Sequence, residues 1–335
     1  MRPDTWTNMN TTDLHLHTDI LNPEKLEARA TRDGFGRGLV DAGKADQRVL
    51  ALCADLSEST RAHWFKEAFP ERYVELGVAE QNLAAVASGF ANYGKIPFMM
   101  SYAAFSPGRN WEHIRSTICI NQVPVKIIGS HAGVSVGPDG ATHQMLEDIA
   151  LMRVLPHMTV IVPADDMQAY KATLAIAQND QPSYLRLARA KTKVFTTEET
   201  PFEIGKSQVV YDNQKATIGI IACGSLVYQS ILAAEELKQH GIDVSVLNLH
   251  TIKPIDTKGV VEFAENMDHI VTAEEHQIHG GMGSAVAEVL SIHNPKKMSY
   301  IGMQDRFGES GEPDELLKHF GLNTQGIVKH IKELK

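Results

Sequence analysis

Short apolar runs alternate with stretches of helical periodicity, and the alternation occurs in two blocks along the chain. In the first block the apolar runs cover residues 48–53, 96–101, 123–129, 159–163 and 183–187, separated by helical patterns that include 83–92, 143–154 and 167–178. In the second block the runs cover 216–223, 244–249, 269–273 and 298–302, with helical patterns at 225–240 and 283–290. This alternation predicts an α/β fold with two domains, each a mainly parallel sheet flanked by helices.

A polar stretch rich in Thr, Glu and Lys, which contains Pro201, separates the two blocks. We therefore predict an N-terminal arm over residues 1–25, a first domain over 26–190, a linker over 191–207 and a second domain over 208–335. A length of 335 residues also favours two hydrophobic cores over one.

Charge and cysteine content restrict the possible partners and compartment. The chain carries 32 Lys and Arg against 41 Asp and Glu, a formal net charge of −9, which argues against a nucleic-acid or membrane-surface partner. An anionic substrate would need a few locally placed cations. Cys53, Cys119 and Cys223 lie among apolar neighbours without a pairing motif, so we expect buried free thiols. With no secretory or membrane-spanning pattern, we expect a cytoplasmic protein.

Glu80 stands at the start of an unusually apolar helical pattern, in the sequence GVAEQN followed by LAAVASGF. A first-turn acid commonly does no more than complement the helix dipole. A carboxyl group beside so apolar a helix can also be desolvated, which suits it to sharing a proton. Periodicity alone does not choose between the two interpretations.

A glycine-rich loop, SHAGVSVGPDGATHQ, follows the apolar run at 123–129 and carries His131, Asp139 and His143. Loops at the carboxyl ends of parallel strands are where such sheets bind ligands. The alternative is a surface loop in which Asp139 only supports a turn. The grouping of two imidazoles and a carboxylate among glycines favours a functional loop that meets a polyol.

Three other features are weaker. Tyr102 and Phe105 follow a strand and could stack on a planar ligand, although aromatic residues more often belong to the core. The sequence GGMGSA at 280–285 lacks the third glycine of a dinucleotide loop, so close helix packing is the better interpretation. The acids and histidines at 274–279 lack a convincing ligand set, so we expect exposed loop residues and no metal site in this chain.

Taken together, GVAEQN, SHAGVSVGPDGATHQ, RNWEHIR and FGESGEPDELLKHFGL resemble the pyrimidine-binding and C-terminal domains of transketolases, in the right order from residue 26 onward. The family's diphosphate-binding domain, with its GDG motif, has no counterpart here. The resemblance implies a thiamine-diphosphate enzyme split into two chains. An N-terminal partner subunit would hold the diphosphate and Mg²⁺, in an assembly of two copies of each chain. The implied reaction is transfer of a two-carbon ketol unit between sugar phosphates.

The resemblance also implies roles for individual residues. Glu80 matches the glutamate that hydrogen-bonds the coenzyme's aminopyrimidine, and the resemblance implies that Tyr102, Phe105 and Arg109 also bind the coenzyme, beside that ring. His143 matches a histidine near the donor carbonyl and joins Glu80 as a catalytic candidate. The residues that match the family's contacts to the sugar phosphate are Arg32, Ser59, His131, Asp139, His143 and Arg189.

Three alternatives stay open at this stage. One is a subunit similar to deoxyxylulose-phosphate synthase, which is normally one long chain. Another is a 2-oxoacid dehydrogenase β-type subunit, whose substrate has no sugar hydroxyls for His131 and Asp139 to meet. The third is a non-catalytic assembly subunit, against which the intact Glu80 argues.

Overall fold

The computed structural model describes residues 14–334, and a seven-stranded sheet organises their first half. Its spatial order is β12-β6-β7-β5-β4-β2-β3, and every neighbouring pair is parallel except β12 with β6. The strands are β2 (Val49–Cys53), β3 (Tyr73–Glu75), β4 (Ile96–Tyr102), β5 (Lys126–Ser130), β6 (Thr159–Ile161), β7 (Ser183–Arg186) and β12 (Thr251–Lys253).

Helices cover both faces of this sheet, so its strands are apolar on both sides. On β2, Val49 and Ala51 pack into one core with α1 (Thr31–Ala45), α3 (Ala62–Ala68) and α7 (Asp166–Ala177). Leu50 and Leu52 point the other way. They pack with α4 (Glu80–Asn92), the π-helix η4 (Ile114–Cys119) and α6 (Asp148–Arg153). Helix α1 approaches α7 so closely that a Cβ on Gly34 would lie 1.9 Å from the carbonyl oxygen of Asp166.

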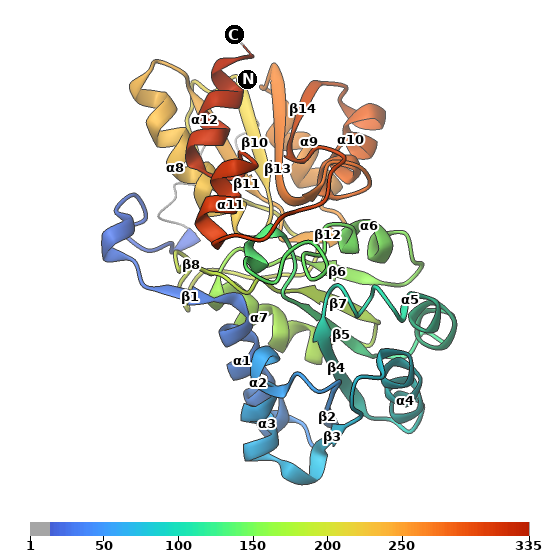
Figure 1. Ribbon diagram of the computed structural model, residues 1–335. Coiled ribbons are helices and arrows are strands. Elements are labelled where there is room, and N and C mark those ends of the chain that lie inside the picture. The colour runs from blue at the N-terminus through green and yellow to red at the C-terminus, as the bar shows by residue number, and fades with distance from the viewer. Residues whose placement is uncertain (1–13, 335) are drawn as a thin grey trace.

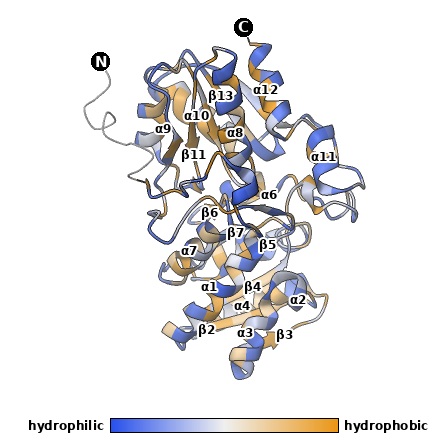
Figure 2. Cartoon of the chain, turned by 90° about the vertical axis from the view of Figure 1, so that its left-hand side faces the viewer, coloured by the Kyte–Doolittle hydropathy of each residue, from blue (hydrophilic) through white to orange (hydrophobic). Residues whose placement is uncertain are grey.

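The second half forms a five-stranded sheet in the order β14-β13-β10-β11-β9, in which only β9 runs antiparallel to its neighbour. Its elements are β9 (Gln208–Tyr211), β10 (Ile218–Ala222), α8 (Leu226–Gln239), β11 (Val244–Asn248), α9 (Thr257–Ala264), β13 (His269–Gln277), α10 (Met282–His293), β14 (Lys297–Met303), α11 (Pro313–His319) and α12 (Thr324–Lys332). Figure 1 shows the two domains stacked end to end, and Figure 2 shows apolar residues concentrated on the inner strands. The α/β fold with two such sheets is confirmed.

Two segments tie the halves together. Strand β12 comes from the second half of the sequence but forms the edge of the first sheet, beside β6. Residues 14–27 form an arm along the linker and the second domain, where the backbone N–H of His17 donates to the carbonyl of Phe195 and the Tyr228 hydroxyl donates to the carbonyl of Ile20. The arm then enters β1 (Ala28–Ala30), which pairs with β8 (Lys191–Lys193). The stretch expected to be a linker therefore begins with a strand.

Other expectations meet mixed outcomes. The three cysteines are buried and free, as predicted. Of the helix expected over 143–154, only the later part forms, as α6 (Asp148–Arg153). The earlier part does not, because residues 137–144 form turns around Gly137 and Gly140. Among the described residues, no helix combines the length and apolar character needed to cross a bilayer.

Candidate active site

Glu80 is buried at the first position of α4, with 3% of its surface exposed. The Ser101 hydroxyl, on β4, lies 3.3 Å from its Oε1 and donates to it. Its Oε2 forms an ion pair with Nη1 of Arg109 at 3.2 Å. The Asn110 amide donates to the Glu80 backbone carbonyl at 2.9 Å. Contacts from β4 and from the segment that follows it therefore fix both the carboxylate and the start of α4.

An aromatic wall stands beside this carboxylate, at the carboxyl end of β4. The rings of Tyr102 and Phe105 are stacked with their centroids 6.0 Å apart. The Arg109 guanidinium lies 4.0 Å from the centre of the Phe105 ring. Tyr102 also stacks on the imidazole of His131, with 3.9 Å between ring centroids, and the rings of His143 and Phe105 form a T-shaped pair with centroids 5.3 Å apart. The wall thus links the carboxylate to the glycine-rich loop.

His131 follows β5 with a left-handed backbone, φ +58°, and is buried. Its Nδ1 lies 2.8 Å from the Ser130 hydroxyl, and its Nε2 lies 3.2 Å from Nη1 of Arg32. Because an arginine can only donate, this Nε2 accepts and the imidazole is neutral. Burial, followed by the charges of Arg32, Arg189 and Arg61, lowers the pKa of His131 from 6.5 to about 3.

Arginines gather around His131. The Arg32 guanidinium donates to the carbonyl of Ser59, while Arg189 donates to the carbonyl of Val136. Burial and then the charge of Arg61 lower the pKa of Arg32. Arg61 itself pairs with Asp33, with 2.6 Å between Nε and Oδ1. Mutual repulsion of these cations makes the region a natural place for an anionic group.

Nine of the ten residues singled out from the sequence are connected through these contacts and charges. The tenth, Asp139, is exposed on the loop between His131 and His143. Ser59 takes part here through its carbonyl oxygen. Sequence reasoning missed Arg61, two residues after Ser59, and also Ser101 and Asn110, which contact Glu80 only because the chain folds back.

The second domain holds the glycine-rich loop in place through Glu275, on β13. The Ser135 N–H donates to its Oε1 at 2.6 Å, and the Ser225 hydroxyl donates to its Oε2 at 3.1 Å. A Cβ on Gly133, where φ is +90°, would lie 2.3 Å from the same carboxylate, so the loop passes over it without a side chain. Burial raises the pKa of Glu275. This domain contact was not foreseen.

The expectation of exposed residues at 274–279 is wrong for the first three of them, because Glu274, Glu275 and His276 are buried in β13. Glu274 accepts the N–H groups of Met282 and Gly283, at 2.7 and 2.8 Å, and so satisfies the start of α10. A Cβ on Gly283 would lie 2.5 Å from the Thr272 hydroxyl, which confirms close helix packing in the GGMG stretch. Across residues 14–334, no three acidic, His or Cys side chains are grouped as metal ligands.

A buried ion pair lies beneath the loop. The Arg186 Nε donates to Oδ2 of Asp148 at 2.8 Å, and the Tyr184 hydroxyl donates to the same oxygen at 2.7 Å. The Arg186 Nη2 also donates to the backbone carbonyl of Glu275 in the second domain at 2.8 Å. One guanidinium therefore joins both sheets under the site.

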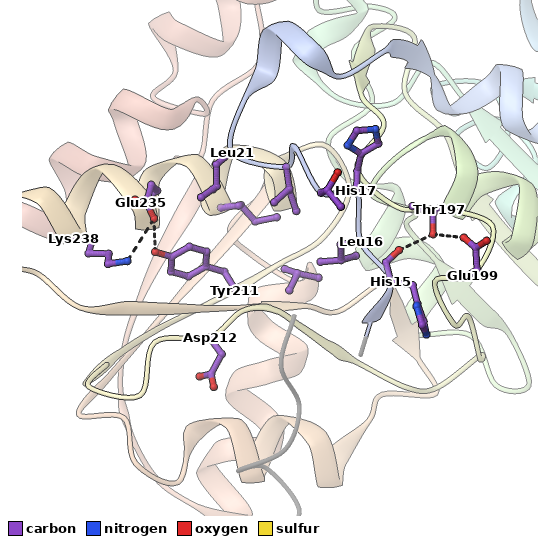
Figure 3. Close-up of a pocket in the computed structure, with 14 residues that line it drawn as sticks. His15, Leu16, His17, Leu21, Thr197, Glu199, Tyr211, Asp212, Glu235 and Lys238 are labelled. Atoms are coloured by element: carbon purple, nitrogen blue, oxygen red, sulfur yellow. Dashed lines mark hydrogen bonds and ion pairs between the residues drawn. The ribbon is translucent and has the colours of Figure 1, made fainter. Parts of the chain in front are cut away.

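A separate pocket of about 790 Å³ lies between the arm and the second domain. Figure 3 shows several of its polar groups paired with one another: Tyr211 with Glu235, and Thr197 with both Glu199 and the backbone of His15. Leu16 and Leu21 contribute apolar side chains to its lining. The pocket is built from other residues than the Glu80 cluster.

Comparison with known proteins adds independent evidence. Residues 27–194 match the family model for the transketolase pyrimidine binding domain, and residues 205–327 match that for the transketolase C-terminal domain. The chain belongs to the transketolase family. It is 43% identical to a putative transketolase C-terminal section from Methanocaldococcus jannaschii, over 91% of this chain and 96% of that protein.

Two further proteins are similar to this chain over nearly its whole length. A 6-deoxy-6-sulfo-D-fructose transketolase subunit from a Clostridium species is 37% identical, over 92% of this chain and 96% of that protein. A solved structure described as a split gene transketolase, inactive beta4 tetramer, superposes with a TM-score of 0.84 at 41% identity, covering 91% of this chain and 97% of that one. This transketolase-family chain therefore has the extent of a C-terminal section.

The neutral state of His131 gives a pH-dependent prediction. The unfolded chain protonates this imidazole near pH 6.5, whereas the folded chain does so only near pH 3, so acidification between these values favours unfolding. Since one pKa unit is worth about 1.4 kcal/mol, protonation of His131 in the unfolded chain should lower the free energy of unfolding by roughly 2 kcal/mol at pH 5. Urea unfolding at pH 7 and pH 5 should show that acidification lowers the free energy of unfolding less in His131→Asn than in the wild type. Asn is chosen because it tolerates the left-handed backbone at this position. If acidification lowers the free energy of unfolding equally in both proteins, His131 is not the group responsible for the acid sensitivity.

Proposed function

We propose that this chain is the C-terminal subunit of a two-chain, thiamine-diphosphate-dependent transketolase that transfers a two-carbon ketol unit from a ketose phosphate to an aldose phosphate. The observation that carries the proposal is the buried Glu80 carboxylate, which pairs with the Arg109 guanidinium that lies on the Phe105 ring, together with the cluster of arginines around His131. Family membership supports the coenzyme class. The similarity to transketolase-type relatives favours this reaction over the two other enzyme types considered from the sequence.

The residues fit the pyrimidine half of the coenzyme. A planar guanidinium already lies on Phe105 while it pairs with Glu80, so the space accepts a flat group with N–H donors. Glu80 would hold the ring nitrogen and exchange a proton with it, and the rings of Tyr102 and Phe105 would exclude water from one side. When bound, the coenzyme supplies the electron sink for cleavage beside the ketose carbonyl. Diphosphate and Mg²⁺ would be held mainly by the N-terminal partner.

The sugar would extend from the aromatic wall toward the arginines. His143, in a T-shaped contact with Phe105, would meet the donor carbonyl end, and Asp139 would meet a donor hydroxyl. The neutral imidazole of His131 would accept or donate a hydrogen bond without adding charge. Arg32 and Arg189 would bind the terminal anionic group, because planar guanidinium donors match a phosphate or a sulfonate.

A reconstitution experiment tests the proposal. The purified chain alone should show no ketol transfer, and activity should appear on adding a diphosphate-domain subunit, thiamine diphosphate and Mg²⁺. Donor and acceptor sugars carrying phosphate or sulfonate should be screened on the complex, and light scattering should show two copies of each chain. Robust turnover by the isolated chain would overturn the split-subunit proposal. Failure of every reconstituted mixture would favour a non-catalytic assembly role.

A further inference from the structure

Arg109 lies between the two groups that would grip the pyrimidine. Its Nη1 is 3.2 Å from Oε2 of Glu80, and its guanidinium carbon is 4.0 Å from the centre of the Phe105 ring. The carboxylate is buried, whereas 49% of the arginine side chain is exposed. The side chain thus pairs with a buried carboxylate while about half of its own surface is open to solvent.

A guanidinium and an aminopyrimidine have in common the properties that suit them to the space between the Glu80 carboxylate and the Phe105 ring. Both are flat, both can lie on an aromatic face, and both present N–H donors in their plane to a carboxylate oxygen. A stacked partner occupies the face of the ring at van der Waals distance, so two planar groups cannot share this side of Phe105. The guanidinium therefore excludes a pyrimidine for as long as it stays.

We propose that Arg109 is a displaceable placeholder, which occupies the pyrimidine position in the coenzyme-free chain and must swing into solvent before the coenzyme binds. This inference rests on the proposed function and deepens it. It differs from the role expected from the sequence, in which Arg109 binds the coenzyme directly. The placeholder keeps a buried carboxylate paired, since an unpaired buried charge would destabilise the empty site.

The contacts of Arg109 are suited to release. The guanidinium makes one ion pair and one ring contact, and no other hydrogen bond from it is found within residues 14–334. By contrast, Arg186 donates to three acceptors and is almost fully buried. An arginine with half its side chain in solvent can change rotamer without opening the core. Its departure leaves the Ser101 hydroxyl in place to hold Glu80 for the incoming ring.

Equilibrium binding of thiamine, which lacks the diphosphate, tests the inference on the full chain alone. Saturation-transfer NMR titrations would compare wild type with Arg109→Ala, Arg109→Gln and Phe105→Ala. The matched control is Arg115→Ala, which removes an exposed arginine on the neighbouring helix η4. We expect wild type and the control to bind weakly, both Arg109 variants to bind about tenfold more tightly, and Phe105→Ala to lose binding. Thermal unfolding would verify that each variant is folded.

A second measurement uses guanidinium ion at millimolar, non-denaturing concentration. It should compete with thiamine in Arg109→Ala, where it can refill the vacated place, and should have little effect on wild type. Weaker thiamine binding by the folded Arg109 variants would make Arg109 a coenzyme ligand and overturn the placeholder alone. Absence of thiamine binding in all of the proteins would overturn the placeholder together with the proposed pyrimidine site.

Discussion

Replacing Glu80 by Gln should abolish ketol transfer in the reconstituted complex, with a fall in kcat of about 10³-fold, while the chain stays folded. The amide oxygen can still accept from Ser101, and the two side chains are nearly identical in shape. What the amide cannot do is exchange a proton with a ring nitrogen. Steady-state kinetics over a range of coenzyme concentrations would separate lost chemistry from weakened binding.

Glu67→Gln provides a matched control, because it makes the same chemical change at an exposed position on α3. It should leave both kcat and the apparent coenzyme affinity unchanged. Circular dichroism and thermal unfolding should coincide for the wild type and both variants. Near-normal turnover by a folded Glu80→Gln variant would remove the acid–base role from this carboxyl group.

Replacing Arg186 by Met should destabilise the chain by about 3–5 kcal/mol, because it leaves the buried Asp148 carboxylate without its cation. The Asp148 Oδ2 would then keep only the hydrogen bond from the Tyr184 hydroxyl, and the Asp148 Oδ1 has no hydrogen-bond partner in the described part of the chain. The arginine also joins β7 to the backbone of Glu275, so the loss should affect both domains. Urea unfolding followed by circular dichroism and by tryptophan fluorescence would measure it.

A double substitution distinguishes the unpaired charge from lost packing. Asp148→Asn combined with Arg186→Met removes both charges and should recover a large part of the stability lost in the single variant. Arg306→Met serves as the surface control, because its pair with Glu309 is exposed and should contribute less than about 1 kcal/mol. If Arg186→Met unfolds at the same urea concentration as Arg306→Met, the buried pair has no special importance.

The parts of the molecule that the sequence predicts well are those set by local pattern. The apolar runs at 48–53, 96–101 and 183–187 became β2, β4 and β7, because strands covered on both faces must be continuously apolar. The start of α4 at Glu80 and the loop after β5 also follow from residues adjacent in sequence. These elements position most of the candidate site.

What the sequence could not reveal depends on residues that meet only after folding. Ser101 reaches Glu80 across 21 positions, and the Glu275 carboxylate reaches Ser135 across 140. Neither residue belongs to a local pattern that would single it out. The acids at 274–275 were expected in solvent because polar residues usually are, but each is buried against backbone N–H groups that need an acceptor. Short strands such as β12 escape detection because three residues carry no periodicity.

Strand β12 has a consequence for how this gene could be cut or recombined. Thr251 and Lys253 pair with Ile161 and Val160, and the Lys253 ammonium binds the carbonyls of Arg153 and Leu155. A fragment that stops near residue 200 would leave β6 as a bare edge, open to intermolecular strand pairing and aggregation. Exchange of C-terminal halves between relatives should therefore succeed only when the donated segment 251–253 complements the recipient's β6. The first-half sheet is therefore complete only when the second half of the same or a compatible chain supplies β12.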